Sequence, residues 1–319
     1  MHDLIVIGTG PAGLAAASYA RFKQLDVVVI GARIGGKAGD RQQLAGQYTR
    51  EELLGEETIN VLMRQLAAHP DCLVNDVVVG VFKRDGVFHV LTETTTWHAW
   101  AVIVATGALP RMLGLPGERS LIGHGLGYSI TTHAHLVTGR DVAVVGTTAR
   151  ALRGVAELVQ YARSVALIAP DPGQLASPLG QQVRVHPRVH LLEGYQVTAV
   201  EASAGAVHAI VVTRGATTHR LPVQAVFVDL GLVPNTQMVR QLVQLDAQGF
   251  IRVDEQNRTS LPGLFAAGDV TTMDGEQMLI VVGDGVRAAR SAYDYILAQR
   301  LEPGGQALSS IGVPLQVGG

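Results

Sequence analysis

The sequence predicts an α/β fold of two similar domains, with the second domain inserted into the first. Three observations lead to this prediction. Apolar runs alternate with helical patterns, two glycine turns each join a strand to an Ala-rich helix (VIGTGPAG at 6–13, VVGTTARA at 144–151), and a third strand-and-turn pattern follows after about residue 240. With 319 residues, 47% of them hydrophobic, the chain is long enough to build two cores.

The first half alternates strands and helices and ends in a buried strand. Its glycine turn stands between strand 3–8 and helix 11–25, and Pro11 is allowed in the first turn of a helix. The pair Asp85-Gly86 indicates the turn of a hairpin over 81–93. The other elements expected here are strand 26–31, a helix over 51–69 that ends before Pro70, and strand 99–107.

The same series begins again at residue 141. The elements expected are strand 141–146, helix 149–162, strand 164–169, a Gly-containing hairpin pattern over 197–215 and strand 225–231. The stretch GLFAAGDV (263–270) and a helix over 282–299 then resume the first domain. We therefore expect domain segments of residues 1–115, 116–240 and 241–319, the last with a loosely ordered C-terminal tail.

Composition excludes several classes of protein. A net charge of −2 gives no reason to expect nucleic acid or an anionic membrane as a partner. No run of about 18 apolar residues is present, and Met1-His2-Asp3 leads directly into a strand without a basic leader, so we expect a soluble cytoplasmic protein. Cys72 is the only cysteine in the sequence, which rules out an intramolecular disulfide and a thiolate metal cluster.

The first glycine turn predicts a Rossmann-like dinucleotide site. Gly8 permits the tight turn, Gly10 lets the backbone approach a pyrophosphate, and Gly13 lets the helix pack closely on the sheet. The helix N-terminus offers free N–H groups and the positive end of a dipole to the phosphates.

The identity of the dinucleotide depends on two later positions. The acid that usually binds the adenosine ribose is missing after the second strand, where Gly31-Ala32-Arg33 stands; Arg33 is compatible with the 2′-phosphate of NADP. Asp269, just past a later strand end, is placed to accept a ribitol hydroxyl, which only a flavin dinucleotide has. The alternative for Asp269 is a cap of the last helix.

Together these stretches resemble the low-molecular-weight thioredoxin reductases, within the flavoproteins that have two dinucleotide domains. The residues that carry the resemblance are GTGPAGLAAASYA, GGKAG, ATGALPRMLGLPGE, GLVPN, FAAGDV and EQMLIVVGDGVRAARSAYDYI, in the family's order and spacing over nearly the whole chain. The resemblance implies two Rossmann-like domains of the three-layer ββα type, FAD in the interrupted first domain, and a homodimer.

The resemblance also implies which residues hold FAD. It places Gly8, Gly10 and Gly13 at the pyrophosphate, Asp269 at the ribitol and Gln277 near the isoalloxazine ring. The full set of cofactor-binding residues that we expect is Gly8, Gly10, Pro11, Ala12, Gly13, Gly31, Arg33, Gly36, Lys37, Ala105, Thr106, Gly107, Gly268, Asp269, Glu276, Gln277 and Met278.

The second glycine turn, which binds NADPH in such reductases, departs from the pattern. Gly146 is followed by Thr147 and Thr148, and β-branched residues resist positive φ and fill the space of a phosphate. Asp171 stands where the family has basic residues for the 2′-phosphate, so we expect NADPH and NADH not to bind. The next helix carries two basic residues, Arg150 and Arg153. They either attract an anion or are solvated charges on the helix surface.

The redox dithiol of the family is also missing. Its place reads GYSITTHAH (127–135), where Ser129 and Thr132 stand for the cysteines and His133 for the following acid. Hydroxyls do not shuttle electrons as thiolates do, so we expect no thioredoxin reduction.

Candidates for catalysis lie in and near the segment 127–135. His124, His133 and His135 are candidates for flavin-coupled proton transfer, or are polar loop residues; their loose spacing speaks against a metal, and we expect none. Tyr128 either stacks near the flavin or packs in the core. His133 and Tyr128 are the two candidates that we keep for catalysis.

Three functional hypotheses follow. The first is an FAD-dependent oxidoreductase that takes electrons from something other than NAD(P)H, such as a ferredoxin-like protein, and has no disulfide reductase activity. The second is a flavoprotein without turnover that regulates or senses redox state. The third is an NADP-dependent dehydrogenase using the first turn and Arg33, and it leaves FAAGDV and the C-terminal match to the family unexplained.

Overall fold

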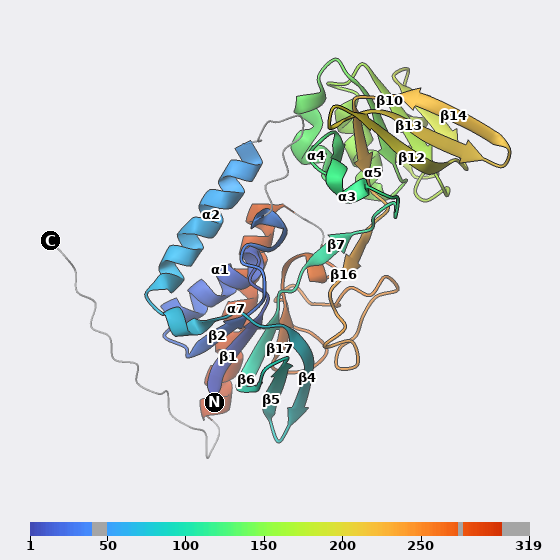
Figure 1. The fold of residues 1–319 in the computed structure, drawn as a ribbon. Coiled ribbons are helices and arrows are strands. Elements are labelled where there is room, and N and C mark those ends of the chain that lie inside the picture. The colour runs from blue at the N-terminus through green and yellow to red at the C-terminus, as the bar shows by residue number, and fades with distance from the viewer. Residues whose placement is uncertain (40–49, 274–276, 302–319) are drawn as a thin grey trace. The chain divides into compact units, whose positions relative to one another are not determined.

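The structure is a computed structural model that describes residues 1–39, 50–273 and 277–301. These residues form two compact units (Figure 1). The described parts of residues 1–40, 54–108 and 234–319 make the first unit, and residues 109–233 make most of the second. The chain passes between the units along β7 (Ala108–Pro110) and β16 (Leu232–Pro234), which pair with each other. The divisions at 108/109 and 233/234 lie seven residues before those expected at 115/116 and 240/241.

The first unit is built on a seven-stranded sheet in the order β3-β2-β1-β6-β5-β4, with β17 also paired to β6. Its strands are β1 (His2–Ile7), β2 (Val27–Ile30), β3 (Leu73–Val74), β4 (Val78–Arg84), β5 (Val87–Thr92), β6 (Thr96–Val104) and β17 (Leu264–Ala266). Its helices are α1 (Pro11–Phe22), α2 (Arg50–Ala67, mostly in this unit), α7 (Met278–Leu301) and the 3-10 turns η1 (Gly36–Gly39), η2 (Pro70–Cys72) and η4 (Gly268–Val270).

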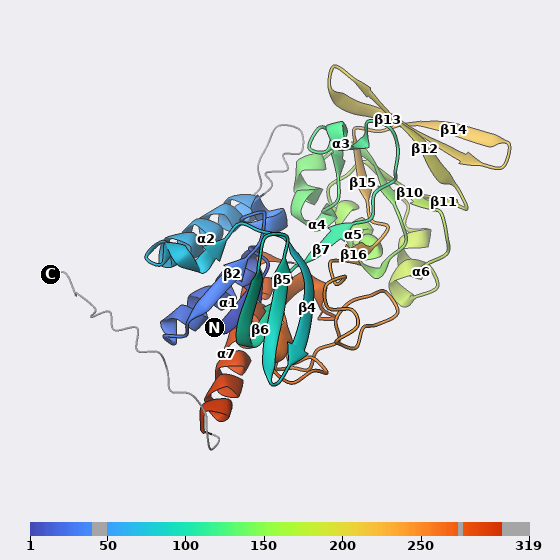
Figure 2. The same ribbon diagram turned by 60° about the horizontal axis from the view of Figure 1, so that its bottom comes forward.

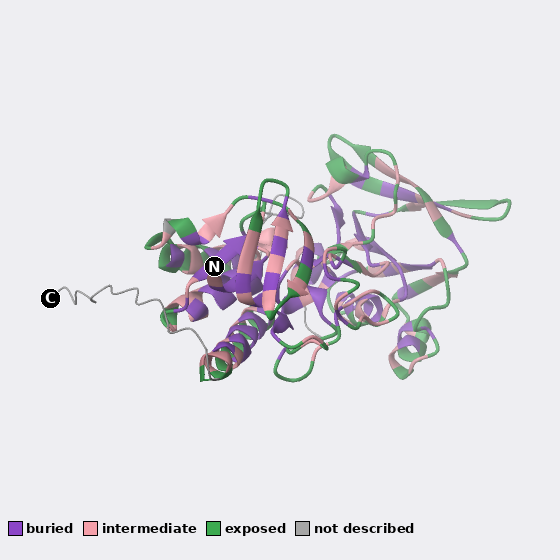
Figure 3. Ribbon diagram, turned by 90° about the horizontal axis from the view of Figure 1, so that it is seen from below, coloured by how far each residue is buried: buried purple, intermediate pink, exposed green. Residues whose placement is uncertain are grey.

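Strands β1, β2 and the end of β6 are parallel, nearly continuous in Val and Ile, and buried (Figure 3), as a sheet covered on both faces requires. Strands β4, β5 and the start of β6 run antiparallel and lie side by side in Figure 2. The expected hairpin is confirmed: Asp85 and Gly86 both have positive φ, at 50° and 81°, as a tight hairpin turn needs.

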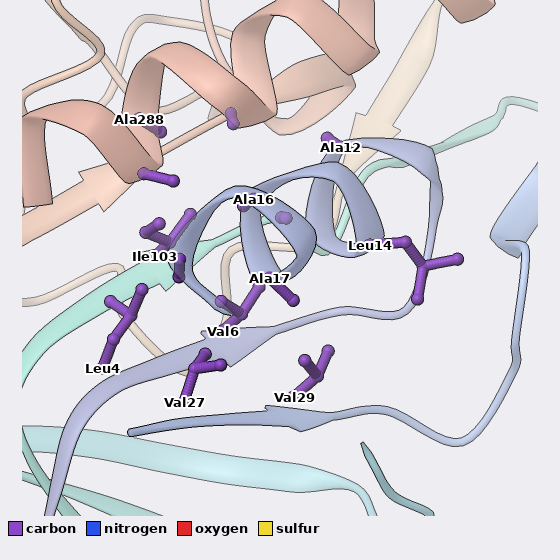
Figure 4. Packing of buried hydrophobic residues seen from close by; sticks show 14 of the residues in the cluster. Leu4, Val6, Ala12, Leu14, Ala16, Ala17, Val27, Val29, Ile103 and Ala288 are labelled. Carbon is purple, nitrogen blue, oxygen red and sulfur yellow. The ribbon is translucent and has the colours of Figure 1, made fainter. Parts of the chain in front are cut away.

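Helices α1 and α7 pack together over one face of this sheet through small residues (Figure 4). Ala12, Ala16 and Ala288 keep the helix axes close, because larger side chains would hold them apart. Gly285 of α7 has no room for a side chain, since a Cβ there would lie 2.0 Å from the carbonyl oxygen of Ala12. The close packing fixes the start of α1 against the start of α7.

The second unit repeats the plan. Its parallel sheet has the order β11-β10-β9-β15-β8, and a three-stranded antiparallel sheet, β12-β13-β14, contributes to a core on one face. The strands are β8 (Leu126–Gly127), β9 (Asp141–Val145), β10 (Ser164–Ala169), β11 (Val189–Glu193), β12 (Gln196–Ser203), β13 (Ala206–Arg214), β14 (Thr217–Pro222) and β15 (Ala225–Val228). The helices are α3 (Glu118–Leu121), α4 (Ile130–His133), η3 (Ala134–Val137), α5 (Ala149–Leu158) and α6 (Pro178–Val185).

Both units therefore have the expected α/β architecture of parallel sheet, helices and antiparallel strands. Some element bounds differ from those predicted: α5 ends at Leu158 rather than residue 162, and α7 begins at Met278 rather than residue 282. Among the described residues, no helix is both long and apolar enough to cross a membrane.

Candidate functional site

Four segments of the first unit meet at the N-terminus of α1. A Cβ on Gly8 would lie 2.2 Å from the carbonyl oxygen of Ala105, so the glycine turn touches the end of β6. A Cβ on Gly36 would lie 3.2 Å from the Cα of Gly10, and one on Gly268 would lie 3.1 Å from the Cβ of Ala12. The turn 8–13, η1, the end of β6 and η4 thus converge, and all four carry residues that the sequence predicts for a cofactor.

We call these four segments (turn 8–13, η1, the end of β6 and η4) the cradle. Gly10 is the open position of this cradle. Its backbone has φ −76°, and a Cβ built on it meets no described atom within 4 Å. Gly13 is the opposite case, because its Cβ would lie 1.9 Å from the carbonyl oxygen of Gly8. Gly13 is therefore needed by the fold itself, whereas Gly10 leaves space in front of the positive end of α1.

Asp269 supplies the anionic side of the cradle. Its Oδ2 lies 2.6 Å from the Nζ of Lys37, and its Oδ1 is buried without a hydrogen-bond partner in the described chain. A buried carboxylate oxygen without a donor is costly, so the site fits a ligand that brings a hydroxyl. The alternative that Asp269 caps the last helix is wrong, because α7 begins only at Met278.

The missing ribose acid has a steric explanation. A Cβ on Gly31 would lie 2.8 Å from the Oγ1 of Thr9, which is itself buried and donates a hydrogen bond to the carbonyl oxygen of Arg33 at 2.7 Å. Thr9 therefore fills the place where an acidic side chain would begin at residue 31.

Asn235 is a residue of this region that the sequence reasoning did not select, although it lies in the quoted GLVPN stretch. Its Nδ2 donates to the carbonyl oxygen of Thr106 at 2.9 Å, its N–H donates to that of Gly107 at 3.0 Å, and its own carbonyl accepts from the Thr106 hydroxyl at 2.6 Å. These three bonds hold the strand end at 105–107 in place.

The last predicted cofactor residues lie at the start of α7. Met278 is buried, and a Cβ on Gly55 of α2 would lie 3.2 Å from its Cε, so Met278 has a packing role. Gln277 is exposed, and Glu276 lies outside the described residues.

The second glycine turn is closed by the protein itself. The hydroxyl of Thr147 donates to the backbone carbonyl of Asp171 at 3.1 Å, and the N–H of Gln174 donates to the carbonyl of Thr147 at 2.9 Å. A Cβ on Gly173 would lie 2.2 Å from the Thr147 hydroxyl, so the loop after β10 packs directly on the turn. The turn does not demand positive φ of its threonines: Thr148 has φ −63°, and only Gly146 in this turn takes positive φ, at 123°.

The first arginine of α5 is engaged in a buried ion pair rather than solvated. Arg150 Nε lies 2.6 Å from Oδ2 of Asp229, and Arg150 Nη2 lies 3.0 Å from Oδ1. Asp229, at the end of β15, is 2% exposed and also accepts from the hydroxyl of Thr148 at 3.0 Å. The expectation of a solvated helix charge is therefore wrong for Arg150, because Asp229 supplies a counter-ion that the sequence pattern did not reveal.

The ion pair between Arg150 and Asp229 leads to a prediction about the stability of the protein. Arg150→Met should lower the free energy of unfolding by about 3 kcal/mol, because it leaves the carboxylate of Asp229 buried without its cation. The exposed Arg153→Met on the same helix is the matched control and should change stability by less than about 0.5 kcal/mol. Urea unfolding followed by circular dichroism measures both. Equal effects of the two changes would contradict a structural role for the pair.

The chain is similar to a known protein family over most of its length. The family profile described as pyridine nucleotide-disulphide oxidoreductase matches residues 2–293. The chain belongs to the pyridine nucleotide-disulphide oxidoreductase family.

Relatives within this family include the F component of alkyl hydroperoxide reductase from Staphylococcus aureus, 31% identical over 309 residues, with 93% of this chain and 59% of the relative covered. The same component from Staphylococcus epidermidis is 30% identical over 302 residues, with the same coverage. The chain thus spans about three-fifths of the length of these curated relatives.

Solved structures of thioredoxin reductases have the same fold. The enzyme of Streptococcus pyogenes matches with a TM-score of 0.80 and 27% identity, covering 93% of this chain and 99% of that one. The enzyme of Giardia duodenalis matches with a TM-score of 0.83 and 23% identity, covering 93% and 99%. The chain is a thioredoxin reductase-like member of the oxidoreductase family, and its two Rossmann-like domains are those of that fold.

In this chain, hydroxyls occupy the positions at which the family resemblance places the dithiol. The hydroxyl of Ser129 donates to the Oγ1 of Thr132 at 2.8 Å, across the first turn of α4. His133 is buried, and its Nδ1 lies 2.9 Å from the carbonyl oxygen of Ser129, so the ring is held within the second unit.

Tyr128, the other catalytic candidate, is held by a buried carboxylate. Its hydroxyl donates to Oε1 of Glu118 at 2.5 Å, and burial, followed by this contact, raises the pKa of Tyr128. Glu118 also accepts from the backbone N–H groups of Leu113, Gly114 and Leu115. Tyr128 thereby belongs to a polar cluster that fixes the segment after β7.

The remaining histidines and the cysteine give no sign of a metal site. His124 and His135 are exposed, and among the described residues no group of three or more His, Cys, Asp or Glu side chains is placed to hold a metal ion. Cys72 is buried after α2, where burial raises the pKa of its thiol.

Proposed function

We propose that this protein is an FAD-binding oxidoreductase that accepts electrons from a donor other than NAD(P)H and has no disulfide reductase activity. The observation that carries the flavin assignment is the cradle of the first unit. Gly10 opens space at the N-terminus of α1, and beside the same turn Asp269 keeps a buried oxygen that no described residue satisfies. The thioredoxin reductase-like fold supports the same cofactor.

The residues of the cradle have distinct parts in holding FAD. The N–H groups at the start of α1 would bind the pyrophosphate, with Gly10 giving the backbone its close approach. Asp269 would accept a ribitol hydroxyl on Oδ1, while Lys37 balances the charge of the same carboxylate on Oδ2. When bound, FAD supplies hydride and single-electron chemistry.

The second unit does not fit a pyridine nucleotide. Its turn is covered through Thr147 by the loop that contains Asp171, and the guanidinium of Arg150 already pairs with Asp229. A phosphate at this turn would have to displace the loop and compete with a buried carboxylate for Arg150. A small redox protein of the ferredoxin type is the donor that we propose in its place, with a homodimer as the assembly.

Anaerobic mixing tests this function. The purified protein is expected to be yellow and to release one FAD per chain on heating. NADPH and NADH should leave the flavin absorbance unchanged and show no tight binding in a titration, whereas dithionite should bleach it. Colourless protein that FAD does not reconstitute would contradict the flavin assignment. Rapid stoichiometric bleaching by NADPH would instead show that the second turn opens to its nucleotide.

A further inference from the structure

Asp284 is an acidic residue on the apolar face of α7. The neighbouring positions Val281, Gly285 and Ala288 are buried against the core, and Asp284 itself is 4% exposed. A carboxylate in such a place is costly unless other groups compensate its charge. The contacts of Asp284 therefore indicate which groups compensate its charge.

The contacts of Asp284 lead to the candidate flavin cradle. Arg287 Nη1 donates to Oδ1 of Asp284 at 3.0 Å, and the backbone N–H of Gly268 lies near enough to the same carboxylate to lower its pKa. Gly268 is the residue directly before Asp269, and it is buried with φ 73°. A Cβ on Gly268 would lie 3.6 Å from the Cβ of Val281, which precedes Asp284 on α7 by about one turn. Asp284 therefore lies beside the turn that carries Asp269.

Asn257 restrains the same turn from the strand side. It is fully buried in the left-handed conformation at φ 61°, and its Nδ2 donates to the carbonyl oxygen of Ala266 at 2.9 Å. The N–H of Ala266 donates back to the Asn257 carbonyl at 3.1 Å, and Arg287 Nη1 reaches the Asn257 side chain at 3.4 Å. Arg287 thus joins Asp284 and Asn257 into one network around the end of β17.

The raised pKa of Asp284 shows that its ionised carboxylate is disfavoured at this position. Burial raises the pKa of Asp284 and the nearby charge of Asp269 adds to this rise, while Arg287 and the Gly268 N–H oppose it. The charge of Asp269 thus acts on Asp284, and each carboxylate has its own cation: Arg287 for Asp284 and Lys37 for Asp269. Packing alone does not explain a second buried carboxylate whose ionised form is disfavoured by the first.

We propose that Asp284 is a positioning residue of the flavin site. With Arg287 and Asn257 it fixes the turn 268–270, so that Asp269 keeps one oxygen available for a hydroxyl of the cofactor. This inference rests on the proposed flavin function, and it adds residues that do not themselves touch the cofactor.

The direct test is the FAD dissociation constant, measured by quenching of flavin fluorescence on titration of the apoprotein. Asp284→Ala should raise it about 10-fold, because Arg287 loses its anion and the network that holds the end of β17 before the turn is weakened. Asp284→Asn should recover part of the affinity, since an amide oxygen still accepts from Arg287 Nη1. The control is Asp294→Asn, an exposed acid of the same helix, which should bind FAD as the natural protein does.

A double-mutant cycle separates positioning from a general structural effect. In an Asp269→Asn background, Asp284→Ala should cause little further loss of FAD affinity, because both changes remove the same interaction. Full additivity of the two losses would overturn the proposal. So would an unchanged dissociation constant in Asp284→Ala. If the natural protein itself binds no FAD, the flavin function is wrong, which is a different result.

The stability of the apoprotein gives an independent readout. Because the pKa of Asp284 is raised on folding, its stabilising contribution is present at low pH and is lost as the pH rises through the folded pKa. The stability of the natural apoprotein relative to Asp284→Ala, measured by thermal unfolding, should therefore fall as the pH rises, while Asp284→Ala weakens FAD binding at neutral pH. A stability difference that stays the same at every pH would contradict the buried carboxylate on which the proposal rests.

Discussion

Gly10→Val is expected to abolish flavin binding and to leave the fold of the first unit intact. The backbone of Gly10 is at φ −76°, which valine adopts without strain, and its Cβ would meet no described atom within 4 Å. The added side chain instead fills the space in front of α1 where the pyrophosphate would approach. We expect the FAD dissociation constant to rise by at least about 100-fold, or ~2.7 kcal/mol.

Two further glycines make this result specific. Gly80→Val in β4 places the same side chain in equally open space, and it should leave both the flavin content and the thermal stability unchanged. Gly13→Val should unfold the unit, since its Cβ would lie 1.9 Å from the Gly8 carbonyl oxygen. Flavin absorbance after purification and circular dichroism measure the two effects. A Gly10→Val protein that retains its FAD would contradict the site.

The second large effect is expected at Ser129 and Thr132. The natural protein should reduce neither thioredoxin nor DTNB, even after dithionite or light has reduced its flavin, because hydroxyls cannot exchange with a disulfide. The double change Ser129→Cys with Thr132→Cys should create a pair that oxidises to a disulfide. The two hydroxyl oxygens already lie 2.8 Å apart, which indicates that both side chains point toward each other from one turn.

The new disulfide is expected to take electrons from photoreduced flavin and to pass them on to DTNB. Either single cysteine variant is the control, since it can form at most a mixed disulfide. NADPH should still not drive the reaction, because the second turn stays closed by Asp171 and Asp229. Disulfide reductase turnover by the natural protein, or a cysteine pair that never couples to the flavin, would each contradict this interpretation.

Much of the first unit could be predicted because its signals are local. The strand before Gly8, the helix after Pro11 and the hairpin at Asp85-Gly86 each depend on a few consecutive residues whose backbone requirements are strict. The resemblance in motif order then identified the family and the two-domain plan, which the family profile and the thioredoxin reductase structures confirm.

The missed features all join residues far apart in the chain. Asp229 pairs with Arg150 across 79 positions, Asn235 binds Thr106 across 129, and Arg287 reaches Asn257 across 30. A lone acid or amide gives no sign in sequence of the donor that it will meet. Asp284 is the one missed residue with a local signal in the sequence. It is an acid on the buried face of a helix, and a buried charge requires a partner.

Residue type and spacing were enough to predict the family, the α/β class, the glycines that a dinucleotide turn requires and the absence of a dithiol at Ser129 and Thr132. Backbone freedom and sulfur chemistry belong to individual residues, so these properties can be read before the chain is folded. The folded arrangement was needed to find that no described residue satisfies one carboxylate oxygen of Asp269, and that Asp229 neutralises Arg150 at the second turn. Burial and charge pairing are properties of a three-dimensional neighbourhood, and the chain brings those neighbours together only when it folds.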